Sequence, residues 1–319
     1  MKVLVVVLNY RTPELVVDCL RSLEHEVQRI RDVRVVVTDN DSGDGSVEII
    51  GSAIEANQWD WCTLMPLERN GGYSAGNNAG IRPYLDAEDA PDYVMLLNPD
   101  AYVHQGAIST LLKFMESRQD VGIAGTRVEN ADGQRAHAAF RFPSVASELI
   151  EGFKLGLLTK LLRNQQLLYD LGDETMQVDW VTGAAMMIRR EVLLDVGLLD
   201  EGYFLYFDEV DFCFRARRAG WTTYCVPASV VTHHQAQATG ITDERKDKRR
   251  YPDYWFDSRR RFFVKNRGKV QAILADIAFL FGYTTFLVRS VLQGKADEEP
   301  PRFWTDFLRN SIFVKGFKL

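Results

Sequence analysis

The first 125 residues alternate short apolar runs with longer stretches in which apolar side chains recur every three or four positions. The periodic stretches at 15–27 and 106–117 predict helices, and Thr12 and Pro13 supply an N-cap and a first-turn proline ahead of the first one. The apolar runs predict strands at residues 3–8, 33–38, 62–67, 93–97 and 121–125. Strands that alternate with helices in this way predict an α/β fold with a mostly parallel central sheet and flanking helices.

Polar residues follow the first four predicted strands at the point where each strand ends. The four ends are Asn9-Tyr10, Asp39-Asn40-Asp41, Arg69-Asn70 and Asn98-Pro99-Asp100. In open α/β sheets, ligands bind outside the carboxyl ends of the strands. One polar strand end would mark only an ordinary loop, whereas four in succession predict a single ligand site assembled from distant parts of the chain.

A segment rich in glycine and asparagine, NGGYSAGNNAG at residues 70–80, follows the third strand. Its glycines allow close backbone approach, and N–H groups ahead of a helix favour phosphate, although a tight turn would use the same residues. It has neither the P-loop lysine nor the GxGxxG spacing. Asp100 is the best candidate metal ligand, because Mg²⁺ or Mn²⁺ would bridge its carboxylate to a diphosphate.

Two adjacent histidines, His233 and His234, follow a predicted strand at residues 222–231 and could add an imidazole ligand. Adjacent side chains on an extended chain point to opposite sides, so at most one of the two faces the site. Ordinary hydrogen bonding is the alternative explanation for this pair.

Three carboxylates lie within four residues in FLYFDEVDFCFRARRAGW, residues 204–221. A helix start would explain two of them, with Asp208 as the N-cap and Asp211 as the third helical residue of an acidic capping box. Negative charge in a first turn also suits the helix dipole. Glu209 is left without a structural role, which makes it a candidate catalytic base.

The composition narrows the class of protein. A chain of 319 residues with 46% apolar residues can form one large or two smaller domains, and its net charge of −6 argues against a protein that coats nucleic acid. The four cysteines show no CxxC spacing, which is typical of reduced, buried thiols in a cytosolic protein. The first apolar run is too short for a signal peptide, and we expect no apolar stretch of membrane-spanning length.

The chain changes character beyond residue 240. Residues 245–269 contain eleven Lys or Arg and three Asp, and residues 270–292 are strongly apolar apart from Asp276 and Arg289. This pattern predicts a basic, aromatic helical extension over residues 241–319. No nucleic-acid-binding module is evident, whereas an in-plane membrane helix fits the basic and aromatic residues. The alternative is a helix packed on the preceding domain or on the second subunit of a homodimer.

Six motifs, in their order and spacing, make the sequence resemble family 2 glycosyltransferases over residues 1–265, within the bacterial rhamnosyltransferase-like branch that builds cell-surface polysaccharides. They are VVVLNYR (5–11), TDNDSGDGS (38–46), ERNGGYSAGNNAGI (68–81), LLNPDA (96–101), WVTGAAMMIRREVLLDVGLLDEGYFLYFDEVDFCFRARRAGW (180–221) and the histidines at 233–234. The resemblance implies a GT-A fold, which is Rossmann-like, over residues 1–240. Its nucleotide-sugar-binding half would be residues 1–125 and its acceptor-binding half residues 126–240.

The resemblance also assigns residues to a donor site. The donor-binding residues that it implies are Asn9, Tyr10, Asp39, Asn40, Arg69, Asn70, Gly72 and Asn98. Of these, Asp39 would accept from the base N–H, and Arg69 would lie near the diphosphate. Asn98-Pro99-Asp100 stands where the family has its Asp-x-Asp motif. Asn98 replaces the first acid of that motif and adds no charge. Asp100 keeps the metal role for Mg²⁺ or Mn²⁺, with His234 as its histidine partner.

The position of the catalytic base follows from the same resemblance. The family commonly has Glu-Asp at this point, with the second acid as the base, and this chain has Asp208-Glu209. Glu209 would therefore accept the proton of the acceptor hydroxyl, with Asp208 and Asp211 as alternatives. Trp180 and Gly183 would contact the acceptor, although Trp180 could equally be a core aromatic.

These inferences predict an inverting, metal-dependent glycosyltransferase with a dTDP- or UDP-linked donor, rhamnose being favoured by the branch. The acceptor would be a glycan or a polyprenyl-diphosphate-linked sugar. The enzyme would be cytoplasmic and peripheral on the inner face of the plasma membrane, through residues 245–319. One alternative is a sugar-phosphate nucleotidyltransferase, which would need a glycine-rich loop where this chain has LNYRTPE. The other is an inactive relative that binds nucleotide-sugars or glycans.

Overall fold

The computed structural model describes residues 2–233, 249–297 and 299–319, which form two compact units. The sheet unit comprises Met1–Phe140, Asp170–Phe204 and Asp208–Thr239, and the helical unit comprises Arg141–Tyr169, Leu205–Phe207 and Gly240–Leu319. The predicted C-terminal helices are present in the helical unit. This unit also takes in residues 141–169, which the sequence placed in the acceptor-binding half.

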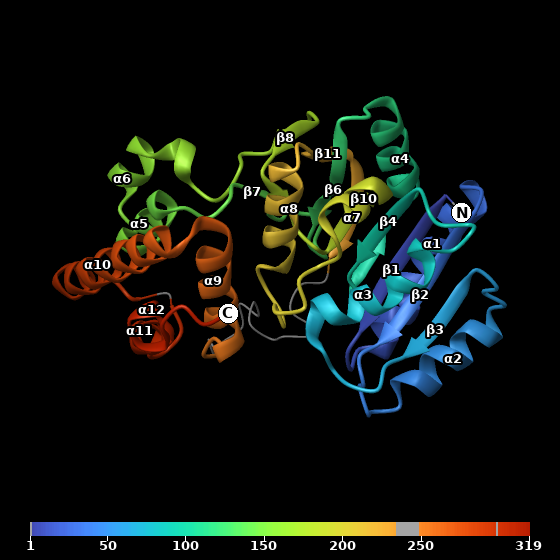
Figure 1. Ribbon diagram of the computed structural model, residues 1–319, viewed down its shortest axis with the longest axis horizontal. Helices are drawn as coiled ribbons and strands as arrows, with labels where there is room; N and C mark the ends of the chain where they lie inside the picture. The colour runs from blue at the N-terminus through green and yellow to red at the C-terminus, as the bar shows by residue number, and fades with distance from the viewer. Residues whose placement is uncertain (1, 234–248, 298) are drawn as a thin grey trace. The chain divides into compact units, whose positions relative to one another are not determined.

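Among the described residues, nine strands form the central sheet of the sheet unit (Figure 1). They are β1 (Val3–Asn9), β2 (Val33–Asp39), β3 (Cys62–Pro66), β4 (Tyr93–Leu97), β5 (Ala101–Val103), β6 (Val121–Glu129), β8 (Met176–Val178), β10 (Ala185–Arg189) and β11 (Thr222–His233). The order β3-β2-β1-β4 is parallel throughout. β10 pairs antiparallel with β4 and β6, β11 runs parallel to β6, and β5 and β8 pair antiparallel with β11.

Helices between these strands confirm the predicted α/β class. They are α1 (Pro13–Arg29), α2 (Ser46–Ala56), α3 (Gly72–Leu85), α4 (Ala107–Ser117), α7 (Arg190–Val196) and α8 (Asp208–Arg218). Helix α1 begins after Thr12 with Pro13 in its first turn, as predicted. The Thr12 hydroxyl accepts no capping bond from the helix N–H groups and instead donates to Asn9 Oδ1 (3.1 Å), so this residue ties the helix start to the end of β1.

Helix α3 approaches β1 closely because glycines face the strand. A Cβ at Gly76 would stand 2.4 Å from Leu8 Cδ1, and one at Gly80 would stand 2.8 Å from Val6 Cγ1. Side chains at either position would push the helix away from the sheet. The segment rich in glycine and asparagine therefore holds α3 against β1 near the carboxyl end of that strand.

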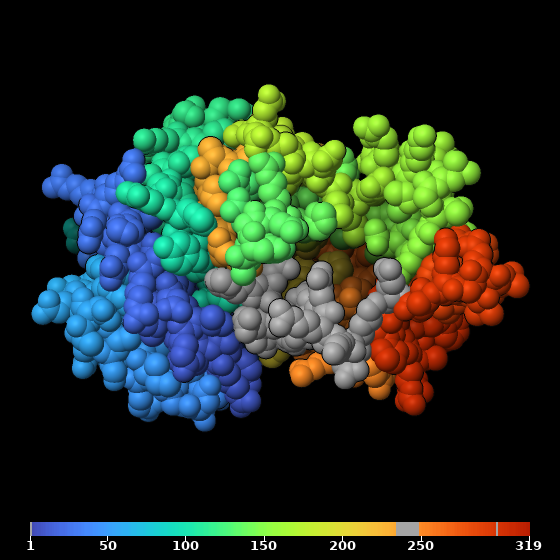
Figure 2. Space-filling view, turned by 180° about the vertical axis from the view of Figure 1, so that it is seen from behind, coloured from blue at the N-terminus to red at the C-terminus, as the bar shows by residue number. Residues whose placement is uncertain are grey.

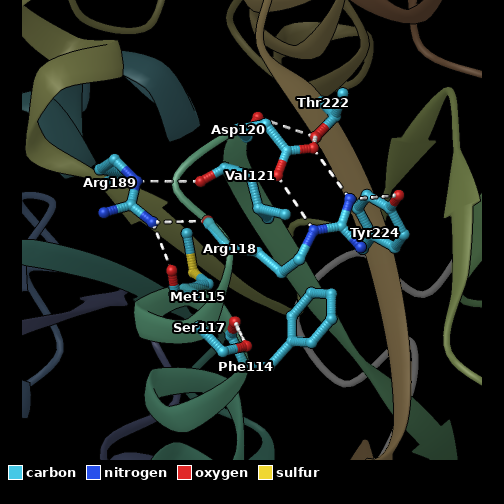
Figure 3. Close-up of polar contacts among 9 residues, drawn as sticks. All are labelled: Phe114, Met115, Ser117, Arg118, Asp120, Val121, Arg189, Thr222 and Tyr224. Carbon is cyan, nitrogen blue, oxygen red and sulfur yellow. Dashed lines mark hydrogen bonds and ion pairs between the residues drawn. The ribbon is translucent and has the colours of Figure 1, made fainter.

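A buried arginine holds the amino end of β4. Arg189 stands opposite Tyr93 in the register of β10 with β4, and its guanidinium donates to Val121 O (2.9 Å) and Met115 O (2.6 Å) (Figure 3). Backbone carbonyls thus satisfy a cation whose burial would otherwise be costly. The carboxyl ends of β1, β2 and β4 lie at the opposite end of the sheet.

The helical unit is built from short helices around one long helix. They are α5 (Val145–Phe153), α6 (Gly156–Leu161), η1 (Arg163–Gln165), α9 (Asp253–Phe262), the π-helical turn η2 (Phe263–Arg267), α10 (Lys269–Gln293), α11 (Phe303–Asn310) and α12 (Ile312–Lys315). α5 and α10 cross at Gly152 and Gly282, where a Cβ would stand 2.7 Å from Phe279 O and 2.8 Å from Phe153 N, respectively. This close crossing joins residues 141–169 to the C-terminal helices.

Among the described residues, α10 is the one helix long and apolar enough to cross a membrane. The sequence showed no uninterrupted apolar stretch of this length, because Asp276 and Arg289 lie within the apolar residues of α10. Length and composition do not separate a spanning helix from a core helix. The inner face of α10 carries the buried Asp276, which accepts from Arg259 Nη1 (2.6 Å) and from Ile312 N (2.9 Å). These contacts build α10 into the helical unit.

Candidate functional site

The polar side chains that end β1 and β2 form one buried cluster. Asn9 Nδ2 donates to Asp39 Oδ2 (2.6 Å), and the Ser42 hydroxyl donates to the same oxygen (2.7 Å). All three residues are buried, so these bonds satisfy groups that would be costly to leave unpaired. The half-buried ring of Tyr10 follows, with the Arg11 guanidinium 5.1 Å from its centre. Sequence reasoning did not single out Ser42, although it lies within the TDNDSGDGS motif.

A second set of contacts joins the end of β2 to the loop after β3. Asn40 Nδ2 donates to Asn70 Oδ1 (2.9 Å), and Asn40 Oδ1 accepts from Gly71 N (3.2 Å). Gly72 has a φ of 82°, and a Cβ there would stand 2.1 Å from Phe204 O, so glycine alone fits. Arg69 is exposed just before this loop. The predicted donor residues from three strand ends therefore lie together.

Four of the eight described non-glycine residues with a positive φ lie in loops that carry candidate residues. Arg11 and Asp41 have φ values of 58° and 56°, just after β1 and β2. Tyr206 and Phe207, immediately before α8, have φ values of 69° and 61°. Left-handed conformations of residues with a Cβ cost about 1–3 kcal/mol each and cluster at functional sites. This pattern supports the same strand ends and the start of α8 as parts of the site.

Asn98 and Asp100 follow β4 and meet the last residue of β11. His233 Nε2 lies 3.0 Å from Asp100 Oδ1 and 3.2 Å from Asn98 Nδ2. His234, the predicted partner of Asp100, lies outside the described residues. Within the described part of the chain, no three His, Cys, Asp or Glu side chains gather as metal ligands. A carboxylate and an imidazole still fit a Mg²⁺ or Mn²⁺ ion whose remaining ligands are diphosphate oxygens and water.

Tyr73 connects the glycine-rich loop to the turn before β10. Its hydroxyl donates to Gly183 O (2.9 Å), and its N–H donates to Phe204 O (2.6 Å). The next residue along the turn, Ala184, accepts from Asn98 N (3.0 Å). Residues 183–184 therefore lie between Tyr73 and the end of β4. Tyr73 belongs to the NGGYSAG motif, but sequence reasoning assigned it no role.

The two predicted acceptor contacts lie in different surroundings. Trp180 lies in β9 (Trp180–Val181) and stacks on Phe140 of β7 (Ala139–Phe140), with ring centres 4.2 Å apart. Gly183 has no room for a side chain, because a Cβ would stand 2.7 Å from the Tyr73 hydroxyl oxygen. Burial raises the pKa of Tyr73 well above its usual value, and the charges of Asp208 and Glu209 raise it further. The Tyr73 hydroxyl thus lies close to the acids that begin α8.

Asp208 and Glu209 form a pair of carboxyl groups at the start of α8. Asp208 Oδ1 accepts from Glu209 N (2.8 Å), and Asp208 Oδ2 is buried without a hydrogen-bond partner among the described residues. Burial raises the pKa of Asp208 well above its usual value, and the adjacent charge of Glu209 raises it further. Burial and the adjacent acid therefore favour the protonated form of Asp208, whereas the Glu209 side chain is only half-buried.

The third acid of this stretch has a different role from the predicted capping box. Asp211 is fully buried and accepts from Arg215 Nε (2.8 Å) and from the Tyr203 hydroxyl (3.2 Å). An ion pair one helical turn apart neutralises its charge. Asp211 thus anchors α8, which leaves the two preceding acids for chemistry.

The sequence match to a known family is extensive. Residues 2–251 match the family described as Glycosyltransferase like family 2. The chain is a family 2 glycosyltransferase. This assignment confirms the enzyme class expected from the sequence motifs and favours it over the nucleotidyltransferase.

Similar proteins from bacteria and archaea agree with this assignment. The glycosyltransferase is 29% identical over 226 residues to the N-acetylglucosaminyl-diphospho-decaprenol L-rhamnosyltransferase of Mycobacterium tuberculosis, covering 66% of this chain and 69% of the relative. It is 29% identical over 266 residues to the low-salt glycan biosynthesis hexosyltransferase Agl10 of Haloferax volcanii, covering 82% and 75%. It is also 29% identical over 168 residues to the rhamnosyltransferase WbbL of Escherichia coli, covering 51% and 61%.

Solved structures share the fold of this glycosyltransferase. The mannosyltransferase PcManGT from Pyrobaculum calidifontis, in complex with GDP-Man and Mn²⁺, superposes with a TM-score of 0.59 at 14% identity, covering 100% of this chain and 88% of that one. TarS 1–349 of S. aureus superposes with a TM-score of 0.54 at 13% identity, covering 99% and 83%. These likenesses confirm the GT-A fold.

Proposed function

We propose that this glycosyltransferase moves rhamnose from a dTDP- or UDP-linked donor to a polyprenyl-diphosphate-linked sugar, with inversion at the anomeric carbon. The names of the mycobacterial and E. coli relatives support the choice of rhamnose, and the former supports the acceptor. The observation that carries the proposal is the carboxyl pair at the start of α8. There the half-buried Glu209 lies beside the buried Asp208, whose pKa is raised, next to a site assembled from the strand ends.

Glu209 acts as the base in the proposed reaction. It accepts the proton of the acceptor hydroxyl while that oxygen bonds to the anomeric carbon. The bond from this carbon to the diphosphate breaks on the opposite face, and the nucleoside diphosphate leaves with the electron pair. Asp208 keeps its own proton, so it adds no second charge, and its hydrogen bond orients the Glu209 carboxylate.

The strand ends would hold the donor. Asp39 is fixed by Asn9 and Ser42, which leaves its carboxylate in one orientation for the base N–H of the nucleoside. Asn70 and the exposed Arg69 would lie along the diphosphate. A Mg²⁺ or Mn²⁺ ion held by Asp100, with His233 or His234, would stabilise the charge of the leaving diphosphate. Asn98 contributes polar contacts without charge.

Donor turnover tests this proposal. The protein is incubated with a panel of dTDP- and UDP-sugars and an N-acetylglucosaminyl polyprenyl diphosphate, with Mg²⁺ or Mn²⁺ or with EDTA. We expect dTDP-rhamnose to be consumed with metal, to be spared with EDTA, and to be consumed again when metal is restored. Asp100→Asn should lose this activity, whereas Asp132→Asn, at an exposed position of the same unit, should keep it. No turnover of any donor with this acceptor would contradict the proposal.

The acceptor also bears on where the enzyme works. A polyprenyl chain is held in a bilayer, so an enzyme that uses such an acceptor must reach the membrane surface. We therefore propose that this glycosyltransferase acts from the cytoplasm at the inner face of the plasma membrane.

A further inference from the structure

One face of α10 is exposed and apolar along the length of the helix. Its exposed positions follow one another at intervals of four and three residues: Val270, Leu274, Ile277, Phe281, Thr284, Val288 and Val291. Phe281 is 62% exposed and Val291 is 81% exposed. The other face packs inside the helical unit, through Gly282 on α5 and through Asp276 on α9 and α12. Contiguous apolar surface of this kind marks an interaction site.

Helix α6 extends this surface at one end of α10. Leu157 and Leu161 are 75% and 78% exposed. Residues 153–154, just before α6, are hydrogen-bonded to α10. Arg289 Nη2 of α10 donates to Phe153 O (2.8 Å) and Lys154 O (3.0 Å). In Figure 2 the yellow-green surface around α6 adjoins the red surface of the C-terminal helices. Two exposed leucines are thus added beside the second half of α10.

The C-terminal residues extend the same surface at the other end of α10. Lys269 Nζ, at the start of the helix, lies 5.3 Å from the ring centre of Phe317. Exposed apolar side chains surround this contact in sequence: Phe313, Val314 and Leu319. We call the exposed stripe of α10, with α6 and residues 313–319, the apolar face.

Basic residues border the apolar face at α6 and at the C-terminal residues, whereas Asp297 and Glu299, just after α10, pair with Lys154. Residues 154–163 contain Lys154, Lys160 and Arg163 and no acid, and residues 311–319 contain Lys315 and Lys318 and no acid. Lys154 is engaged by Glu299 (2.6 Å). The one acid of α10, Asp276, is buried and paired with Arg259. The border of the apolar face therefore suits a negatively charged partner.

The positions that flank the exposed stripe distinguish a lipid surface from a partner helix. Helices that pair along a heptad seam commonly carry charged residues on both sides of it, which select the partner. Here the flanking residues are uncharged on both sides: Ile273, Leu280 and Leu287, and Gln271, Ala278 and Thr285. A broad apolar face with basic residues at its border is typical of a helix that lies in the membrane interface.

We propose that the apolar face lies on the surface of an anionic phospholipid bilayer, with α10 in the plane of the membrane. Phe281 and Val288 enter the boundary between headgroups and acyl chains, and Lys160 and Lys318 contact lipid phosphates. α10 does not cross the bilayer, because its Asp276 is held inside the unit by Arg259. This proposal deepens the proposed function and rests on it only for the presence of the acceptor in the same bilayer.

Sedimentation with vesicles tests the proposal on the full chain without donor or acceptor. We expect binding to phosphatidylcholine vesicles that contain phosphatidylglycerol, and much weaker binding to phosphatidylcholine alone. Phe281→Gln with Val288→Gln should weaken binding at least about tenfold. The control pair, Ile49→Gln with Leu194→Gln, removes two exposed apolar residues from the sheet unit and should leave binding unchanged. Lys160→Gln and Lys318→Gln should each weaken binding about fivefold.

Several outcomes would overturn the proposal. One is a failure of the wild type to bind anionic vesicles. Another is a Phe281 and Val288 variant that binds these vesicles as tightly as the wild type. A dimer in solution that this variant converts to a monomer, without vesicle binding, would assign the apolar face to a second copy of the chain. Release from vesicles by detergent and not by high salt would indicate a spanning helix. Turnover with a detergent-dispersed acceptor tests the proposed function separately, so failure of one can be told from failure of the other.

Discussion

Two buried aspartates, Asp208 in the sheet unit and Asp276 in the helical unit, differ in what lies beside them. Asp276 accepts from Arg259 Nη1 (2.6 Å) through one oxygen and from Ile312 N (2.9 Å) through the other. Asp208 accepts from Glu209 N (2.8 Å) through one oxygen, and its other oxygen has no hydrogen-bond partner among the described residues. Each aspartate has a second acid nearby, but only Asp276 and Glu148 share a cation.

This difference separates a structural acid pair from a reactive one. Burial raises the pKa of Glu148, and the adjacent Arg259 guanidinium opposes that rise. Burial and Glu209 both raise the pKa of Asp208, and only backbone N–H groups oppose them. Like charge beside a buried carboxyl group disfavours its ionised form, and groups perturbed in this way are concentrated at catalytic sites. We therefore propose a catalytic role for Asp208 and Glu209, whereas Glu148 and Asp276 share an ion pair with Arg259.

The largest effect on stability should come from removing the shared cation. Arg259→Met leaves Glu148 and Asp276 buried without a cation, so the free energy of unfolding should fall by about 3–5 kcal/mol. Chemical denaturation of the full chain measures this loss. Arg21→Met, which breaks an exposed pair with Asp18, is the control and should change little. A loss below about 1 kcal/mol for Arg259→Met would remove the contrast between the two pairs.

A smaller effect is expected at Asp208, because asparagine resembles a protonated carboxyl group. Asp208→Asn keeps a hydrogen-bond donor toward Glu209, so turnover should stay within about tenfold of the wild type. Asp208→Ala removes this donor and should lose more activity. Steady-state rates at saturating donor and acceptor compare the two variants. Equal, severe losses in both would mean that the charge of Asp208 itself is needed, against the protonated state assigned here.

Asp208 should also link stability to pH. A carboxyl group whose pKa is raised by folding stabilises the protein fully when the pH is below its pKa in the unfolded chain, which is about 4. This contribution is lost as the pH rises toward the pKa of the group in the folded protein. Asparagine does not titrate, so the melting temperature of Asp208→Asn relative to the wild type should rise between about pH 4 and about pH 7. A difference that falls over this range would contradict a protonated Asp208.

The smallest effect should come from the hydroxyl that faces the pair. Tyr73→Phe removes the hydrogen bond to Gly183 O (2.9 Å) and should lower the free energy of unfolding by about 0.5–1.5 kcal/mol. Tyr102→Phe, at an exposed position, is the matched control. If the free energy of unfolding of Tyr73→Phe equals that of the wild type, this hydrogen bond between the glycine-rich loop and residue 183 does not contribute to stability.

The strands and the polar strand ends could be predicted because they depend on local patterns. The runs at 3–8 and 33–38 are β-branched, and parallel pairing brings Asn9 opposite Asp39 without further information. The assignment of residues 141–169 to the helical unit could not be predicted. It depends on the fit of Gly152 to Gly282, which lie far apart in the chain. Local periodicity carries no signal for such a crossing.

The site was predictable as a set of residues, but not as a set of contacts. Glu209 could be singled out because a helix start explained its neighbours and not this residue. The ion pair of Asp211 with Arg215 is local to α8 and could have been found from its spacing of four residues. The contact of Tyr73 with Gly183 depends on tertiary packing, and so does the choice between His233 and His234. In the structure, His233 Nε2 lies 3.0 Å from Asp100 Oδ1. The metal-binding role predicted for His234 stays a prediction.

The central claim is that the carboxyl pair without a cation supplies the catalytic base. Single-turnover rates of Glu209→Gln and the wild type, with saturating dTDP-rhamnose, lipid-linked acceptor and metal, test it most directly. We predict a rate lower by about 10²–10⁴-fold in the variant, with an unchanged melting temperature and unchanged donor affinity. A rate within about threefold of the wild type would contradict the claim and move the base away from Glu209.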